Sequence, residues 1–151
     1  VTMVDAASLN GFIETLQQTA RRDVSPGTAL GTAMALGAVY LDEKPACWKR
    51  TLDISGDGKS NLGPRPRDVK DAISARGVTV NALVIGADGS GFGGQGQGEI
   101  GELSSYFRAE VITGPDAFVE TALGFDDYEA AMTRKLLREL EVLAESGLSL
   151  D

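Results

Sequence analysis

Apolar residues along the chain fall into short segments and longer periodic stretches. The short segments, which carry β-branched and other apolar residues, predict strands at residues 49–55 and 78–85, with shorter strands near 110–113 and 117–121. The most apolar of them, 78–85, is typical of a strand that is covered on both faces, as in a parallel sheet. The pattern therefore predicts a central sheet with buried strands.

The periodic stretches place apolar residues three and four positions apart, which is the spacing of one helix face. They predict helices at residues 6–22, 28–41, 67–76, 99–108 and 126–146. In the first helix this spacing is followed by Leu9, Phe12, Ile13 and Leu16, with Ser8 as the expected N-cap. In the last helix we expect a buried face made of Tyr128, Met132, Leu136, Leu137 and Leu140.

The order of these elements predicts the fold class. Residues 49–85 read as strand, turn, helix and strand, and Gly77 stands where the helix is expected to end. A crossover of this kind joins parallel strands. Helices and strands alternate over the whole chain, so we expect one α/β domain over residues 1–151, with a glycine-rich surface loop at Gly86–Gly98.

Composition and charge exclude several classes of function. The 151 residues carry a formal net charge of −8, which disfavours nucleic acid as a partner. The absence of histidine excludes Ser-His-Asp and Cys-His catalysis and histidine-bound zinc, and a single cysteine excludes an internal disulfide. The apolar runs are too short for a membrane span, which takes roughly 18 residues. We expect Glu99, Glu102 and Glu110 to lie on solvated helix faces.

Two polar turns carry the candidate chemistry. Asp57 follows the strand predicted at 49–55, and Thr28 follows a Ser-Pro-Gly turn at the start of a helix. Loops that leave the carboxyl ends of parallel strands converge on one crevice. A carboxylate and a hydroxyl that meet there are hard oxygen ligands, suited to Mg²⁺, or to Mn²⁺ or Ca²⁺ in its place.

Several longer segments resemble a known family when they are read in order. They are Ser-Pro-Gly-Thr-Ala-Leu-Gly from Ser25, Asp-Ile-Ser-Gly-Asp-Gly from Asp53, Gly-Val-Thr-Val-Asn-Ala-Leu from Gly77, the stretch Tyr106–Phe118 and the stretch Arg134–Glu139. Together they resemble the von Willebrand factor A-like domains, and more closely an uncharacterised bacterial branch of them. The resemblance implies a three-layer α/β/α, Rossmann-like fold with a mostly parallel sheet.

The resemblance also implies a function and a site. Proteins of that family bind a divalent cation at the carboxyl edge of the sheet, in a metal-ion-dependent adhesion site, and a carboxylate of a protein partner often completes the coordination. Matching positions imply that Thr28 and Asp57 are metal ligands. The side chains expected at the rim of the site or just behind its ligands are Ser25, Asp53, Ser55 and Asn61. The chain is then a non-catalytic binding module, and its relatives look exported.

The chain departs from the family at its metal motif. The family's Asp-x-Ser-x-Ser occurs nowhere in these residues, and in the family it lies on a strand that would precede Val1. We therefore expect a sheet without its first strands, Val1–Val4 as the tail of the missing part, and a weak metal site rich in water. The sequence Asp53-Ile-Ser-Gly-Asp57 imitates the motif and leaves open a register in which it is the first strand. Otherwise we expect Asp53 to be a buried carboxylate bonded to backbone or hydroxyl groups.

Two other functions stay open. Without a preceding strand, residues 49–55 form an exposed sheet edge, which could pair with an upstream segment, a cleaved fragment that stays bound, or a second copy of the chain. That edge favours an assembly subunit. The Gly86–Gly98 loop contains G-x-G-x-x-G, an imperfect dinucleotide fingerprint that favours a nucleotide- or phosphate-binding enzyme.

Overall fold

A parallel three-stranded sheet forms the centre of the molecule. The computed structural model describes residues 5–20, 26–86 and 95–147. Within them the sheet has the order β1-β2-β3, made of β1 (Arg50–Gly56), β2 (Val78–Ile85) and β3 (Val119–Ala122), and both pairings are parallel. This confirms the α/β class and the parallel crossover.

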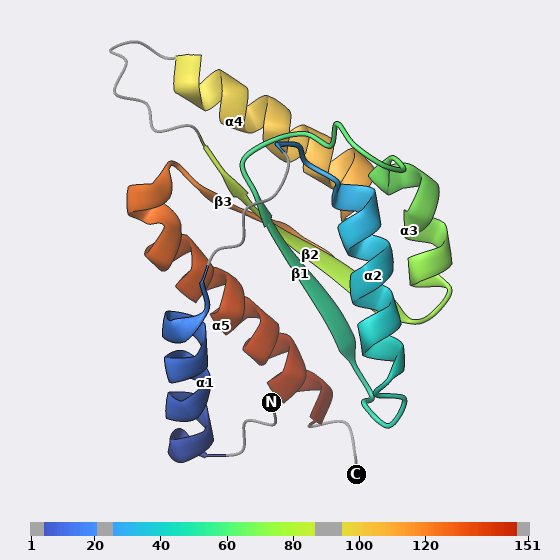
Figure 1. Cartoon of the computed structure of the whole chain (residues 1–151), viewed down its shortest axis with the longest axis vertical. Helices are drawn as coiled ribbons and strands as arrows, with labels where there is room; N and C mark the ends of the chain where they lie inside the picture. Colours follow the sequence, from blue (N-terminus) through green and yellow to red (C-terminus); the bar gives the residue numbers. More distant parts are fainter. Residues whose placement is uncertain (1–4, 21–25, 87–94, 148–151) are drawn as a thin grey trace.

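Helices lie on both faces of this sheet (Figure 1). The α-helices are α1 (Ala6–Gln18), α2 (Leu30–Asp42), α3 (Pro66–Ser74), α4 (Gln95–Tyr106) and α5 (Tyr128–Gly147). Two short turns complete the description: a π-helical turn, η1 (Phe107–Val111), and a 3₁₀ turn, η2 (Phe125–Asp127). No helix in the described ranges is long and apolar enough to cross a membrane. The arrangement is the three-layer, Rossmann-like one.

Strand β2 explains how one segment supports two layers. All eight of its residues are buried, and successive side chains point to opposite faces of the sheet. Val78, Val80, Ala82 and Val84 belong to the larger core, which α2, α3 and η1 cover, whereas Leu83 packs against α5. A strand that is buried on both faces needs mostly apolar residues, and β2 is apolar at every position except Thr79 and Asn81, which is why the sequence predicts it clearly.

The larger core depends on close approach between its helices and the strands. Met34 of α2 and Phe107 of η1 are fully buried, and each side chain of that size contributes roughly 1.5–3 kcal/mol by leaving water. Glycines allow this approach. A Cβ at Gly31 would lie 2.1 Å from the Pro64 carbonyl oxygen, and one at Gly37 would lie 2.6 Å from the Leu52 side chain.

The predicted buried face of the last helix is only partly right, because Tyr128 and Met132 pack against the core beside Leu83 but the three leucines do not. Leu136, Leu137 and Leu140 are about half exposed, at 47%, 55% and 60%, while Lys135 is fully buried. The lysine faces the sheet because Asp53 of β1 binds its ammonium group there, together with Glu139 of its own helix. The ion pair between α5 and the sheet therefore decides which face of α5 is buried.

The segment after α4 also differs from its prediction. The strand expected near residues 110–113 is replaced by η1, and Thr113 makes only an isolated bridge to Val80. In the helical continuation Phe107 and Val111 lie four positions apart on one face, and both are completely buried. The glycine-rich loop is shorter than expected, because α4 already begins at Gln95; residues 87–94 lie outside the described ranges.

Helix α1 begins where it was predicted to begin, but it ends earlier and has a different N-cap. It begins at Ala6 behind Asp5, whose carboxylate accepts from the Ser8 backbone N–H at 2.8 Å, so the N-cap is Asp5 and not Ser8. None of its residues is buried, and Leu9, Ile13 and Leu16 are 46%, 42% and 57% exposed. The apolar stripe of α1 is therefore largely exposed.

Candidate cation site at the carboxyl end of the sheet

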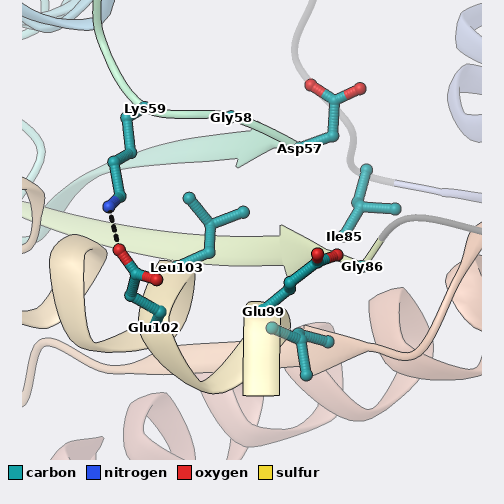
Figure 2. A pocket seen from close by; sticks show the side chains of 9 residues that line it. Asp57, Gly58, Lys59, Ile85, Gly86, Glu99, Glu102 and Leu103 are labelled. Atoms are coloured by element: carbon teal, nitrogen blue, oxygen red, sulfur yellow. Dashed lines mark hydrogen bonds and ion pairs between the residues drawn. The ribbon is translucent and has the colours of Figure 1, made fainter. Parts of the chain in front are cut away.

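A hollow opens where β1 and β2 end. It has a volume of about 250 Å³ and lies between the turn that follows β1, the end of β2 and helix α4. Its lining residues are Asp57, Gly58, Lys59, Ile85, Gly86, Glu99, Ile100, Glu102 and Leu103. Figure 2 shows this hollow from close by. Its position follows from the topology, because the carboxyl ends of neighbouring parallel strands lie at the same edge of a sheet.

Polar contacts fix the turn after β1 against α4. The Lys59 ammonium donates to the Glu102 carboxylate, and it lies 5.9 Å from the centre of the Tyr106 ring. The hydrogen bond from Lys59 and its charge lower the pKa of Glu102. One residue further along, the Ser60 backbone N–H donates to the Tyr106 hydroxyl at 3.2 Å. Lys59 and Glu102 thus neutralise each other at one side of the hollow.

Asp57 and Glu99 are the other two charged residues of the hollow. Asp57 is exposed, and within the described residues no hydrogen bond or ion pair holds its carboxylate. Figure 2 shows that the Glu99 side chain extends from α4 toward the end of β2. The Asp57 side chain points away from Glu99. Glu99 and Glu102 are exposed on α4, as expected, but the sequence did not show that they line a hollow, because nothing in it places α4 next to the turn of Asp57.

The Thr28 turn is bonded to the turn that carries Asn61. The Thr28 backbone N–H donates to Asn61 Oδ1 at 2.8 Å, and the Thr28 carbonyl accepts from the Asn61 N–H at 2.9 Å and from the Leu62 N–H at 3.1 Å. The Ser60 hydroxyl donates to the same carbonyl at 3.2 Å. Gly27 has φ +150, and a Cβ there would lie 2.2 Å from Leu62, so the close contact requires glycine.

The predicted site residues are therefore only partly brought together. Thr28 and Asn61 are joined directly, and Asp57 lies four residues before Asn61 in the same turn, but neither Thr28 nor Asn61 lines the hollow. Ser55 is exposed on β1 and lies outside the hollow's lining. Ser25 lies outside the described residues.

Asp53 belongs to a different cluster, beneath α5. It was expected to be buried and bonded to backbone or hydroxyl groups, but its side chain is 40% exposed and binds the Lys135 ammonium. The same ammonium donates to Glu139 at 2.7 Å, and the Asn81 side-chain amide donates to Glu139 at 2.8 Å. Asp53 pairs with Lys135 because the fully buried lysine needs an anionic partner on the sheet as well as on its own helix.

The two carboxylates of this cluster have opposite pKa shifts. Burial raises the pKa of Asp53, the contact with Lys135 offsets this in part, and the nearby Glu139 charge adds to the rise. Burial also acts to raise the pKa of Glu139, but hydrogen bonds from Lys135 and Asn81 outweigh it and hold the pKa below its ordinary value. Glu139 is thus the carboxylate that the lysine keeps ionised.

The donors at the hollow suit a hydrated cation better than a closed metal cage. Within the described ranges, no group of three or more aspartate, glutamate, histidine or cysteine side chains could hold a metal ion. Asp57 and Glu99 line the hollow, and within the described residues no ion pair holds either carboxylate, although the Asp57 side chain points away from Glu99. Mg²⁺ commonly binds through one or two carboxylates and keeps several waters. The residues present therefore fit a weak, water-rich divalent site.

Comparison with known proteins gives one match. The sequence profile of a family described as "Protein of unknown function (DUF1194)" matches residues 1–144. No curated protein and no solved structure matches the chain.

Proposed function

The chain belongs to the protein family of unknown function DUF1194, and we propose that it is a cation-dependent binding module of the von Willebrand factor A-like class. In this proposal a divalent cation binds at the carboxyl end of the sheet through Asp57, with water filling most of its coordination. A carboxylate of a protein partner then takes one of the water positions. The chain performs no reaction of its own and acts by binding.

The charge of the hollow is the observation that carries this proposal. Its lining holds three carboxylates and one ammonium, and that ammonium is already paired with Glu102. Asp57 and Glu99 then leave the hollow with an uncompensated negative charge, which attracts a cation and repels a phosphate. The same charge speaks against the nucleotide-binding alternative.

The contact between the two polar turns gives further support. Four hydrogen bonds hold the Thr28 turn against residues 60–62, so a hydroxyl from one loop and a carboxylate from another are kept at the same end of the sheet. This is the arrangement that the resemblance to von Willebrand factor A-like domains implies for Thr28 and Asp57. Thr28 would contribute through its hydroxyl or through a bound water.

The test is the thermal unfolding of the whole chain in EDTA and in millimolar Mg²⁺, Mn²⁺ or Ca²⁺. At ten times the dissociation constant, a ligand stabilises the folded state by about 1.4 kcal/mol. For a domain of this size that raises Tm by roughly 3–6 °C. We expect the increase in the wild type and in Asp71→Asn, an exposed charge removed from α3, and its loss in Asp57→Asn.

An equal increase in Asp57→Asn and the wild type would show that the cation does not bind at Asp57. ATP and NAD⁺ serve as probes of the alternative function. We expect neither to change Tm, because both would bring phosphates to a negatively charged hollow. A nucleotide-dependent increase would favour the enzyme instead.

A further inference from the structure

The side of α2 that faces away from the sheet is a second surface, separate from the hollow. α2 covers one face of the sheet beside α3 (Figure 1), and its buried residues are Leu30, Gly31, Met34 and Ala38. The helix has no charged residue before Asp42, its last position. A helix that is apolar all round is normally buried all round. The outward side of α2 therefore has the composition of a contact surface.

The outward residues form one stripe along α2 and its two caps. Leu36 is two positions from both Met34 and Ala38, which are almost fully buried, so it points to the opposite side of the helix. Steps of three and four residues from Leu36 define what we call the outer stripe: Ala29, Thr32, Leu36, Val39, Tyr40 and Glu43. Leu36, Val39 and Tyr40 are 50%, 49% and 61% exposed. Alternating steps of three and four are the spacing with which two helices pack along a seam.

The two ends of the outer stripe differ in charge. At the N-terminus of α2 the cap residue Ala29 makes no side-chain hydrogen bond, and the first turn has no acidic residue to balance the positive end of the helix dipole. At the C-terminus the cap residue Glu43 is exposed beside the negative end of the dipole, which is unfavourable for a carboxylate. Arg50 and Arg76 bind Asp42, and within the described residues no ion pair holds Glu43. Each end of α2 thus suits the other end of a second α2.

We propose that the outer stripe binds the outer stripe of a second copy of this chain, with the two α2 helices antiparallel and a two-fold axis at Leu36. Leu36 is the middle of the stripe, because Ala29 and Glu43 each lie seven positions from it. The axis pairs Leu36 with the partner's Leu36, and Tyr40 with the partner's Thr32. It also brings Glu43 to the partner's Ala29, at the positive end of the partner helix. Both dipole ends are then better balanced than in a single copy.

Charge and symmetry favour a second copy as the occupant. A two-fold contact requires a surface that is complementary to itself, and the outer stripe meets this condition in its apolar centre and at its ends. Each copy carries a formal net charge of −8, so two copies approach best where the surface between the ends has no charge. One pair of short helices is small for a specific interface. We therefore expect a weak dimer, with a dissociation constant of about 10–100 μM.

The first test is sedimentation equilibrium of the whole chain over a concentration series that spans this range. Leu36→Lys places two ammonium groups at the two-fold axis and should abolish the dimer. Leu137→Lys makes the same change at a leucine of α5 that is 55% exposed, and it serves as the matched control. Glu43→Lys should weaken the dimer about tenfold, because it brings a cation to the positive end of each helix. Circular dichroism checks that all three variants fold.

The second test determines the direction of the helices by disulfide cross-linking. The exposed Cys47 is first replaced by serine. Leu36→Cys in this background should form a disulfide-linked dimer under mild oxidation, because the axis places the two positions together. Glu43→Cys should not, because its neighbour is the partner's Ala29.

Four results would overturn the proposal. The wild type could be a monomer up to about 0.5 mM, which would leave the stripe to another occupant. Leu137→Lys could weaken the dimer as much as Leu36→Lys does, which would place the contact elsewhere. Glu43→Lys could leave the dimer unchanged or strengthen it, which would remove the role of the helix ends. Glu43→Cys could cross-link as readily as Leu36→Cys, which would make the helices parallel.

Discussion

Replacing Lys135 by methionine removes the charge at the centre of the α5 cluster with little change in side-chain volume. The lysine is fully buried, and its loss leaves Asp53 and Glu139 facing each other without a cation. Removing one partner of a buried ion pair costs about 3–5 kcal/mol. Here the Asp53 side chain is 40% exposed and Glu139 keeps the Asn81 amide, so water and that amide offset part of the loss.

We therefore expect the variant to be less stable by about 2–3 kcal/mol at neutral pH, at the lower end of the cost of a broken buried pair. For a domain of this size, that lowers Tm by roughly 4–12 °C. Urea unfolding measures this difference in free energy directly when the wild type and the variant have the same denaturant slope m. The further change Glu139→Gln should restore part of the stability, because it removes the unpaired buried charge.

The pH dependence of this variant gives a second readout. In the wild type the lowered pKa of Glu139 contributes stability that is present at neutral pH and is lost as acid protonates the group. Asp53 acts in the opposite direction, because its raised pKa favours the folded state as pH falls. Without Lys135 both carboxylates have raised pKa values, so the deficit of the variant should shrink between about pH 7 and pH 5. A deficit below about 0.5 kcal/mol at pH 7, or one that grows on acidification, would refute the role given to Lys135.

Two other substitutions test the packing and the polar turns. Gly31→Ala places a Cβ 2.1 Å from the Pro64 carbonyl oxygen and should destabilise the protein by about 2–3 kcal/mol in urea unfolding, whereas Gly101→Ala, with no atom within 4 Å, should be neutral or slightly stabilising. If the two variants unfold alike, the close approach of α2 is not as described. Asn61→Ala removes the acceptor for the Thr28 N–H and should cost about 1 kcal/mol, with faster hydrogen exchange at the Thr28 amide. Unchanged exchange at Thr28 would mean that Asn61 does not hold the two turns together.

The sequence by itself determined most of the helices and strands and the α/β class. The mostly apolar segment Val78–Ile85 specifies a strand buried on both faces, and Gly77, with φ +70, ends the segment that precedes it. These features are local. The side-chain period is two residues in a strand and 3.6 in a helix, and a glycine with positive φ affects only the turn that contains it. The parallel sheet followed from the order of the elements, because a strand–helix–strand crossover joins two parallel strands.

The tertiary structure alone decided which side chains meet. Leu136 and Lys135 are neighbours on α5, and hydrophobicity favours burying the leucine, yet the lysine is inside because Asp53 arrives from a strand 82 positions earlier in the numbering. Glu99 became part of the hollow for the same kind of reason, since α4 crosses the end of β2 next to the turn of Asp57. Burial of a charge depends on where its partner lies in space, and that partner is set by the packing of distant segments, which no local pattern encodes.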